Sequence, residues 1–259
     1  MGLRMPKFCA NLSLLFTEVD LVERFEMAKK AGFTAVEIQF PYSLSAEKIK
    51  ALLQEHQLSL VLFNIDADDL LQGGEGLAAV PEKKAQFQLA VAQALEYAQI
   101  LQPEVINVLS GCCFDLNRAQ AYLETFKENL AYVVDVFTPL GIKIVFEAIN
   151  SYDMPGFIIS TSQDMLEILT ELSLDNLYVQ YDIYHRVSMG ESVADFINQH
   201  VDKIGHIQFA DCPGRHQPGS GLIDFQKIFS LIDRSAYSGW VGAEYKPIGE
   251  TTNSLGWFK

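Results

Sequence analysis

Short runs of aliphatic and β-branched residues recur along the whole chain. Several are mostly apolar at successive positions, as in residues 105–109. A strand with one solvent-exposed face would instead alternate apolar with polar residues. Such runs are typical of parallel strands that are covered on both faces. We predict eight strands, over residues 8–12, 35–40, 58–64, 105–109, 142–147, 177–182, 204–209 and 240–244.

Longer segments with helical periodicity lie between the predicted strands. Leu21, Phe25 and Ala28 fall on one stripe, and Gly32 follows as a stop signal. Ser45 is placed to cap a helix over residues 46–56. Further helices are predicted over residues 83–101, 119–140, 161–172 and 224–233.

The alternation of strands and helices predicts an α/β protein, either a barrel or a large open sheet. Neither GxGxxG nor GxxxxGK[ST] follows the first strand, which removes the usual nucleotide-binding reasons for an open sheet. The 259 residues also match the roughly 250 residues of a barrel domain. We therefore predict one (β/α)8 TIM barrel that spans residues 1–259.

Composition and charge restrict the partners. The formal net charge of −14 repels phosphate backbones, so we expect no nucleic-acid partner. No apolar run reaches the ~18 residues of a membrane span, and no signal-peptide pattern is present. The four cysteines lack paired or framework spacing, so we expect reduced thiols in a cytoplasmic protein. A homo-oligomer is left open.

Four oxygen-bearing side chains end the last four predicted strands: Glu147, Asp182, Gln208 and Glu244. In a barrel these strand ends converge at one mouth. One such residue could be a helix cap or a surface charge, but four on consecutive strands favour a shared site. Three carboxylates would repel one another without a cation among them. An all-oxygen ligand set predicts one divalent metal ion, Mg²⁺ or Mn²⁺.

The chain resembles the hydroxypyruvate isomerase family, among the xylose-isomerase-like TIM barrels, along nearly its whole length. The most specific segments are Gly242-Ala243-Glu244-Tyr245-Lys246-Pro247 and Leu255-Gly256-Trp257-Phe258. Others are Phe8-Cys9-Ala10-Asn11-Leu12-Ser13, Phe40-Pro41-Tyr42, Tyr181-Asp182-Ile183-Tyr184-His185 and His206-Ile207-Gln208. Related sugar epimerases usually have His where this chain has Gln208, which favours the isomerase branch. The chain departs from the family at Cys9, where a small residue such as Ala is expected, and at Leu109-Ser110-Gly111-Cys112-Cys113.

This resemblance implies that Glu147, Asp182, Gln208 and Glu244 bind the metal and that Glu147 and Glu244 form an acid/base pair. The implied reaction interconverts hydroxypyruvate and tartronate semialdehyde through an enediolate. A four-carbon 2-oxo-tetronate isomerase and a ketose 3-epimerase are alternatives, as is a metal- or sugar-acid-binding protein without turnover. An abasic-site endonuclease would need a His-rich zinc cluster and a basic face, whereas this chain has five His.

An anionic 2-oxo acid or sugar acid needs positively charged or hydrogen-bonding partners. Candidates for substrate binding are His185, Arg215 and Lys246, which follow the last three strands. Each also has a purely structural interpretation: His185 as a loop histidine, Arg215 as part of a solvated turn, and Lys246 as a surface charge. His206, two residues before Gln208, lines the lumen or packs as a core histidine. The long loop over residues 66–84 contains three glycines and is either a surface loop or a lid.

Overall fold

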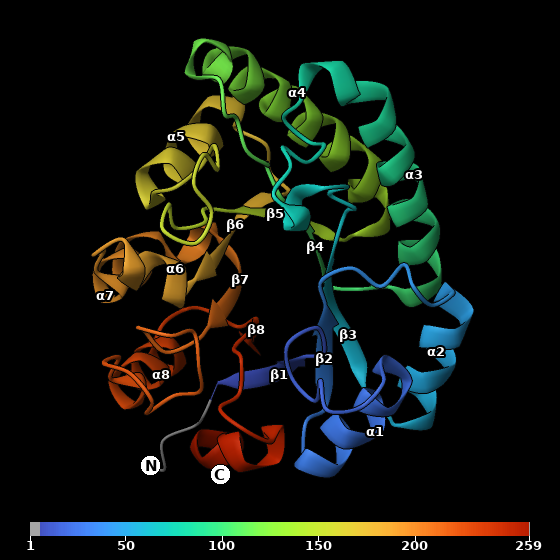
Figure 1. Ribbon diagram of the computed structural model, residues 1–259, viewed down its shortest axis with the longest axis vertical. Helices are drawn as coiled ribbons and strands as arrows, with labels where there is room; N and C mark the ends of the chain where they lie inside the picture. Colours follow the sequence, from blue (N-terminus) through green and yellow to red (C-terminus); the bar gives the residue numbers. More distant parts are fainter. Residues whose placement is uncertain (1–5, 259) are drawn as a thin grey trace.

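Eight parallel strands close into a barrel in which each strand pairs with the strands before and after it in the sequence. This computed structural model describes residues 6–258 and confirms the predicted (β/α)8 architecture. The colours of Figure 1 run once around the barrel, and the helices form the outer ring. The strands are β1 (Lys7–Asn11), β2 (Ala35–Ile38), β3 (Ser59–Asn64), β4 (Val105–Val108), β5 (Lys143–Glu147), β6 (Leu177–Asp182), β7 (Ile204–Phe209) and β8 (Trp240–Ala243).

The helices begin and end close to the predicted positions. They are α1 (Leu21–Ala31), α2 (Ala46–Glu55), α3 (Lys84–Leu101), α4 (Ala119–Phe137), α5 (Ser162–Leu172), α6 (Ile183–Ser188), α7 (Val193–His200) and α8 (Phe225–Arg234). Short 3₁₀ segments cover Leu70–Gln72, Pro81–Lys83, Leu116–Arg118, Thr138–Leu140, Val201–Lys203 and Thr251–Phe258. Gly32 ends α1 in the left-handed conformation, and the Ser45 hydroxyl accepts a hydrogen bond from the Lys48 amide, as predicted.

Two helices between β6 and β7 are absent from the sequence prediction. Residues 183–186 of α6 are all buried, so the helix has no polar face there to produce an amphipathic pattern. His185 therefore lies on a buried helix, and its interpretation as a loop histidine was wrong. No helix within residues 6–258 is long and apolar enough to cross a membrane.

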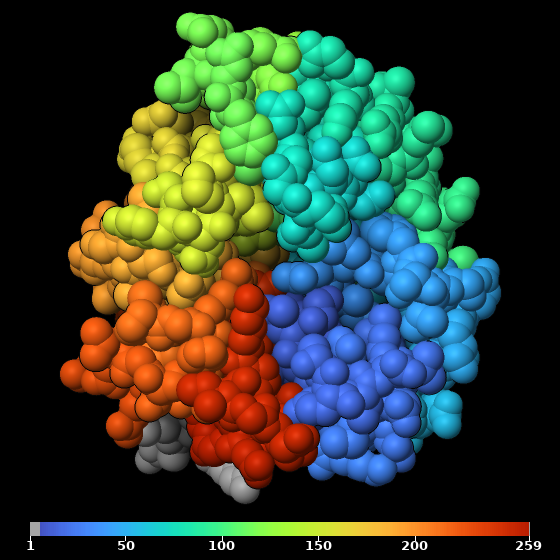
Figure 2. Space-filling view, in the orientation of Figure 1, coloured from blue at the N-terminus to red at the C-terminus, as the bar shows by residue number. Residues whose placement is uncertain are grey.

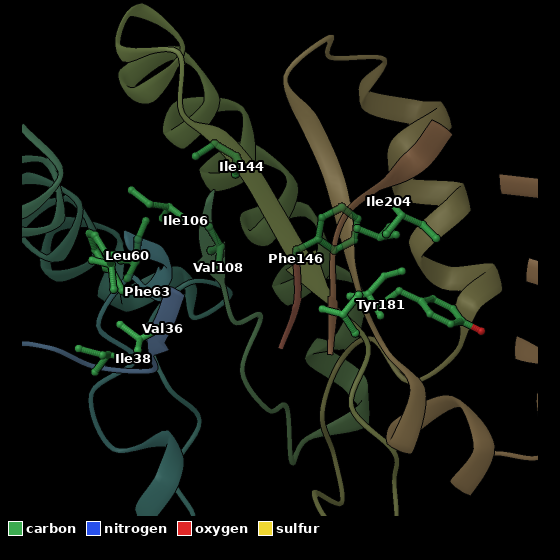
Figure 3. Packing of buried hydrophobic residues seen from close by; sticks show 14 of the residues in the cluster. Val36, Ile38, Leu60, Phe63, Ile106, Val108, Ile144, Phe146, Tyr181 and Ile204 are labelled. Carbon is green, nitrogen blue, oxygen red and sulfur yellow. The ribbon is translucent and has the colours of Figure 1, made fainter. Parts of the chain in front are cut away.

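The strands face two different environments. Their outward side chains form the main apolar core against the helices; Val36, Ile106, Ile144 and Phe146 are examples (Figure 3). A smaller apolar cluster includes Cys9, Leu62, Val105 and Val145. The same strands also carry polar side chains, such as Asn107, Glu147 and Gln180, which are hydrogen-bonded to one another near the carboxyl ends of the strands. The barrel thus presents its chemistry at one end and packs apolar side chains elsewhere.

The loop over residues 66–84 is anchored along part of its length. Leu77, Ala78, Ala79 and Val80 are buried in the main core, whereas Leu71 is exposed and borders the pocket described below. Ala67 and Leu70, earlier in the loop, are also buried, in a smaller apolar cluster. Moving the whole loop would expose these side chains, so any lid motion is restricted to residues 71–76 between them. The lid role stays a prediction.

We expect Gly205→Ala to destabilise the barrel. Gly205 lies at an irregularity in the pairing of β6 with β7, and an added Cβ would stand 2.6 Å from Val145 Cγ1 and 2.8 Å from Tyr178 Cβ. Overpacking of this kind typically costs about 1–3 kcal/mol. Chemical denaturation measures the loss. Gly256→Ala is the matched control, because no atom of the described chain lies within 4 Å of its added Cβ; equal stability of the two variants would contradict the packing argument.

Candidate active site and metal centre

A pocket of about 630 Å³ opens at the carboxyl ends of the strands. The face shown in Figure 2 is hollowed near its centre. Among the residues that line the pocket are Glu147, His185, Arg215, Glu244 and Lys246, all of which the sequence analysis proposed as site residues. Asp182 and Gln208 lie deeper, and both are almost completely buried.

Three buried carboxylates, those of Glu147, Asp182 and Glu244, lie at the base of the pocket. Ligand atoms of Glu147, Asp182 and His185 lie within 4.8 Å of one another. Glu244 is linked to this group through Arg215, whose Nη2 lies 2.7 Å from Glu244 Oε2 and 3.6 Å from Asp182 Oδ2. One guanidinium therefore faces two of the carboxylates, and the carboxylates outnumber it.

Gln208 is connected to the carboxylates through a neighbouring amide. Gln180 Nε2 donates to Gln208 Oε1 at 2.7 Å and to Glu147 Oε1 at 2.9 Å. Asn107 Nδ2 also donates to Glu147 Oε1, at 2.8 Å. On the other side, Glu244 Oε1 accepts hydrogen bonds from Asn11 and Gln39. The structure thus joins all four predicted ligands in one network, and their assignment as metal ligands stays a prediction.

Burial and mutual repulsion favour protonated carboxyl groups. Burial, then the charges of Glu244 and Asp182, raise the pKa of Glu147 to about 8. Burial raises the pKa of Glu244 to about 7, against the opposing charge of Arg215. The pKa of Asp182 is also raised by burial. These groups share one electrostatic environment, so a cation among them would stabilise all three ionised forms.

The donor set fits a divalent ion. Asp182 Oδ2 is buried and has no hydrogen-bond partner within residues 6–258. Orphaned buried oxygen atoms are costly unless a cation or a donor reaches them. Together with the Glu147 and Glu244 carboxylates and the Gln208 carbonyl, this atom completes the oxygen-rich set that Mg²⁺ and Mn²⁺ prefer.

His185 points its two ring nitrogens at different partners. Nδ1 lies 2.7 Å from Asn150 Nδ2 and also faces the Asn150 backbone amide, so it acts as an acceptor. Nε2 lies 3.4 Å from Asp182 Oδ2. Burial, and then the charges of Arg215 and Arg186, hold the His185 pKa well below its usual range. A neutral imidazole with its proton on Nε2 therefore faces the site.

The loop after β7 holds Arg215 in an unusual backbone conformation. Arg215 has a φ of 58°, in the left-handed region that costs a non-glycine residue roughly 1–2 kcal/mol. Buried Asp211 organises this loop, because its carboxylate accepts hydrogen bonds from the backbone amides of Cys212, Gly219, Gly221 and Ile223. A strained backbone conformation of this kind is tolerated where the surrounding structure holds a functional side chain in place.

Lys246 differs from the other predicted site residues because its side chain is exposed and lies at the edge of the pocket. Its backbone N–H donates to the Arg215 carbonyl at 2.8 Å, and its carbonyl lies 2.7 Å from His216 Nδ1. The segment after β8 thereby supports the Arg215 loop, while the Lys246 ammonium is free to reach the pocket rim.

Several polar residues of the site were not predicted from the sequence. Gln180 and Asn107 contact Glu147, and Asp211 shapes the Arg215 loop. Gln180 stands two residues before Asp182, and Asn107 interrupts an apolar run, so strand alternation would have placed both on the inner face. His206 packs against buried Glu37, with 2.7 Å between Nε2 and Oε2, beneath the level of Gln208.

Comparisons with known proteins agree on one family. The model of the xylose isomerase-like TIM barrel family matches residues 25–259. The 2-oxo-tetronate isomerase of Haemophilus influenzae is 38% identical over 255 residues, which cover 98% of this chain and 99% of that protein. The hydroxypyruvate isomerase of Escherichia coli is 38% identical over 253 residues, 98% of each chain.

A solved structure shares this fold closely. The crystal structure described as an AP endonuclease of family 2 from Brucella melitensis has a TM-score of 0.94 and 37% sequence identity, over 98% of each chain. The names of these relatives therefore include two small-molecule isomerases and one nuclease.

Metal binding should release protons. With pKa values of about 8 and about 7, Glu147 is mostly protonated and Glu244 about half protonated at pH 7 in the metal-free protein. An ion displaces these protons, so we expect about one proton per Mn²⁺ bound at pH 7 and a smaller release above pH 8. Calorimetry of Mn²⁺ binding in two buffers of different ionisation enthalpy measures this number.

The raised pKa values of Glu147 and Glu244 also determine how the stability of the metal-free protein changes with pH. Because both folded pKa values are raised, the folded metal-free protein binds these protons more tightly than the unfolded chain does. Their contribution to stability is therefore present at low pH and is lost as the pH rises from about 5 to about 8. Mn²⁺ should raise the melting temperature more at pH 8 than at pH 5.5. Proton release near zero at pH 7 would contradict the shared electrostatic site.

Proposed function

This chain belongs to the xylose isomerase-like TIM barrel family and is an isomerase similar to the hydroxypyruvate and 2-oxo-tetronate isomerases, and from that premise we propose that it isomerises a 3-hydroxy-2-oxo acid with a divalent metal ion. The observation that carries the proposal is the pair of buried carboxyl groups, Glu147 and Glu244, at the base of one pocket. Each has a pKa near neutrality, which suits a group that takes and returns a proton.

The reaction moves one hydrogen from C3 to C2 and another from the oxygen on C3 to the oxygen on C2. One carboxylate removes the proton from C3 of the 2-oxo acid, and either that group or its counterpart delivers a proton to C2. The hydroxyl proton passes from the C3 oxygen to the C2 oxygen, so hydroxypyruvate becomes tartronate semialdehyde. A divalent ion bound by Glu147, Asp182, Gln208 and Glu244 would polarise the two substrate oxygens and stabilise the negative charge of the enediolate.

Other residues orient the acid. The Arg215 guanidinium contacts Glu244, lies 5.2 Å from the Tyr184 ring centre and lines the pocket, where it can bind the substrate carboxylate with two N–H groups. His185 offers its Nε2 proton to a substrate oxygen. Lys246 adds positive charge at the rim, which matters in a protein with a net charge of −14 because the overall field repels anions.

The pocket also favours the four-carbon substrate as a second candidate. Its volume of about 630 Å³ exceeds what a three-carbon acid needs. Asp153 and Tyr184 lie on its wall, and the Tyr184 hydroxyl donates to Asp153 Oδ2 at 2.9 Å. These groups offer hydrogen bonds to a hydroxyl on a fourth carbon, which hydroxypyruvate lacks. Relative kcat/KM values for hydroxypyruvate and 2-oxo-tetronate decide between the two.

Nuclease activity fits the site less well. The described candidate ligand groups include two histidines, His185 beside the carboxylates and His206 in a separate cluster with Cys9 and Glu37. A multi-zinc site rich in histidine is therefore not assembled in residues 6–258. The charge of −14 also opposes DNA binding.

Glu147→Gln and Glu244→Gln should each lower turnover by roughly 10²–10⁴, the usual effect of losing a positioned acid or base. Glutamine keeps an oxygen for the metal ion but cannot accept the proton. The measurement is deuterium incorporation from solvent into the 2-oxo acid, with Mn²⁺ affinity measured in parallel. Glu167→Gln on the exposed face of α5 is the matched control. Near-normal exchange by either site variant would remove that residue from the acid/base pair.

Arg215→Ala should weaken binding of substrates that carry a carboxylate more than binding of neutral ketoses. Loss of the Arg215–Glu244 contact affects both substrate types, whereas the charge-assisted hydrogen bonds to the anion are lost only for the acids. We expect KM for the 2-oxo acid to rise about tenfold or more, equivalent to the ~1.4 kcal/mol or greater loss of one such bond. Steady-state kinetics on both substrate types measures the difference. Equal losses on both would show that Arg215 does not recognise the carboxylate.

A further inference from the structure

We propose that Glu37, which does not line the pocket, is a positioning residue that fixes which end of the Gln208 amide faces the metal site. This inference rests on the proposed function only in requiring that the site above binds a divalent ion. The inference concerns which way the neutral side-chain amides are turned, and this orientation follows from their hydrogen-bond partners, not from charge or sequence position.

Glu37 is a fully buried carboxylate surrounded by hydrogen-bond donors. Its Oε1 accepts from Gln208 Nε2 at 2.7 Å and from Asn11 Nδ2 at 2.9 Å. Its Oε2 faces His206 Nε2 at 2.7 Å and accepts a weak hydrogen bond from Cys9 Sγ at 3.4 Å. An ionised carboxylate only accepts, so every neighbour must turn a donor toward it.

The backbone opposite Glu37 leaves room for this carboxylate. A Cβ added to Gly242 on β8 would stand 2.4 Å from Glu37 Oε2 and 2.6 Å from Oε1. The four side chains within hydrogen-bond distance of the Glu37 oxygens, those of Gln208, Asn11, His206 and Cys9, each have a group that can donate to them. Glu37 is thus held as an acceptor at the floor of the site.

One arm of the network runs from Glu37 to Glu147. Because the Gln208 NH₂ group must face Glu37, its Oε1 is left for the upper side. There it accepts a hydrogen bond from Gln180 Nε2, which also donates to Glu147 Oε1. The direction of each hydrogen bond follows from the one before it. Glu37 thereby presents a carbonyl oxygen, the atom that a hard divalent ion prefers.

The other arm runs from the same Glu37 oxygen to Glu244. Asn11 Nδ2 donates to Glu37 Oε1 at 2.9 Å and to Glu244 Oε1 at 3.1 Å, and Asn11 Oδ1 accepts from the Ser13 amide. A single buried carboxylate therefore orients one amide toward each of the two proposed acid/base residues. Partners of this kind usually change metal affinity by roughly 10–100-fold when they are replaced.

Replacing Glu37 with its amide tests the direction of the network. Glu37→Gln keeps size and shape but introduces an NH₂ group that must face a donor. The conflict is relieved when the Gln208 amide turns over, and its NH₂ then faces the metal site. We expect Mn²⁺ affinity to fall roughly 10–100-fold, measured from the electron paramagnetic resonance signal of free Mn²⁺. Cys9→Ser, which changes the weakest donor to Glu37, is the matched control and should bind Mn²⁺ nearly as the wild type does.

A compensating exchange separates positioning from loss of folding. The double variant Glu37→Gln/Gln208→Glu swaps donor and acceptor, so the new amide donates to the new carboxylate. We expect it to bind Mn²⁺ more tightly than either single variant, including the case in which Glu37→Gln alone folds poorly. Equal Mn²⁺ affinity of wild type and Glu37→Gln, or no rescue in the double variant, would overturn the role of Glu37. A wild-type protein that binds no Mn²⁺ would instead contradict the metal site itself, and this inference with it.

Discussion

The rest of the site depends on the repulsion among three carboxylates that the barrel buries side by side. Glu147, Asp182 and Glu244 come from β5, β6 and the end of β8, and the folded chain forces them together with Arg215 as the guanidinium between them. Burial, and then the charges of neighbouring carboxylates, raise the pKa values of the two glutamates to about 8 for Glu147 and about 7 for Glu244. The electrostatic repulsion among these carboxylates favours binding of a divalent cation between them. It also leaves Glu147 and Glu244 able to gain and lose protons near neutral pH.

The barrel supplies the rigidity that such crowding requires. Outward side chains of the strands pack against the helices, so the strand ends cannot relax apart without opening the main core. Below the carboxylates, Glu37, Gln208 and Asn11 form a hydrogen-bonded floor that orients each acceptor. Above them, Asp211 holds the loop that carries Arg215. The charged groups are thus fixed from both sides, and little reorganisation is needed when charge develops on a substrate.

Sequence patterns predicted the eight strands because the apolar runs and helical stripes are locally encoded, and the chain length favoured a barrel over an open sheet. They also placed Glu147, Asp182, Gln208 and Glu244 at neighbouring strand ends, which the structure joins in one network. They could not identify Gln180 or Asn107 as partners of Glu147, because hydrogen-bond direction depends on contacts between strands. They also missed α6, whose buried residues show no amphipathic pattern. A lid role for residues 66–84 depends on the free-energy difference between open and closed loop conformations, and the positions of the glycines do not encode that difference.

The most direct test of this account is the position of a bound metal ion. Crystals grown with Mn²⁺ and measured at the manganese absorption edge locate the ion by its anomalous scattering, independently of any activity. The account predicts one strong peak within about 2.0–2.4 Å of oxygen atoms from Glu147, Asp182, Gln208 and Glu244, the range for hard divalent ions. A peak among Cys9, Glu37 and His206, the other group of candidate ligands, or no peak at the mouth of the barrel, would contradict it.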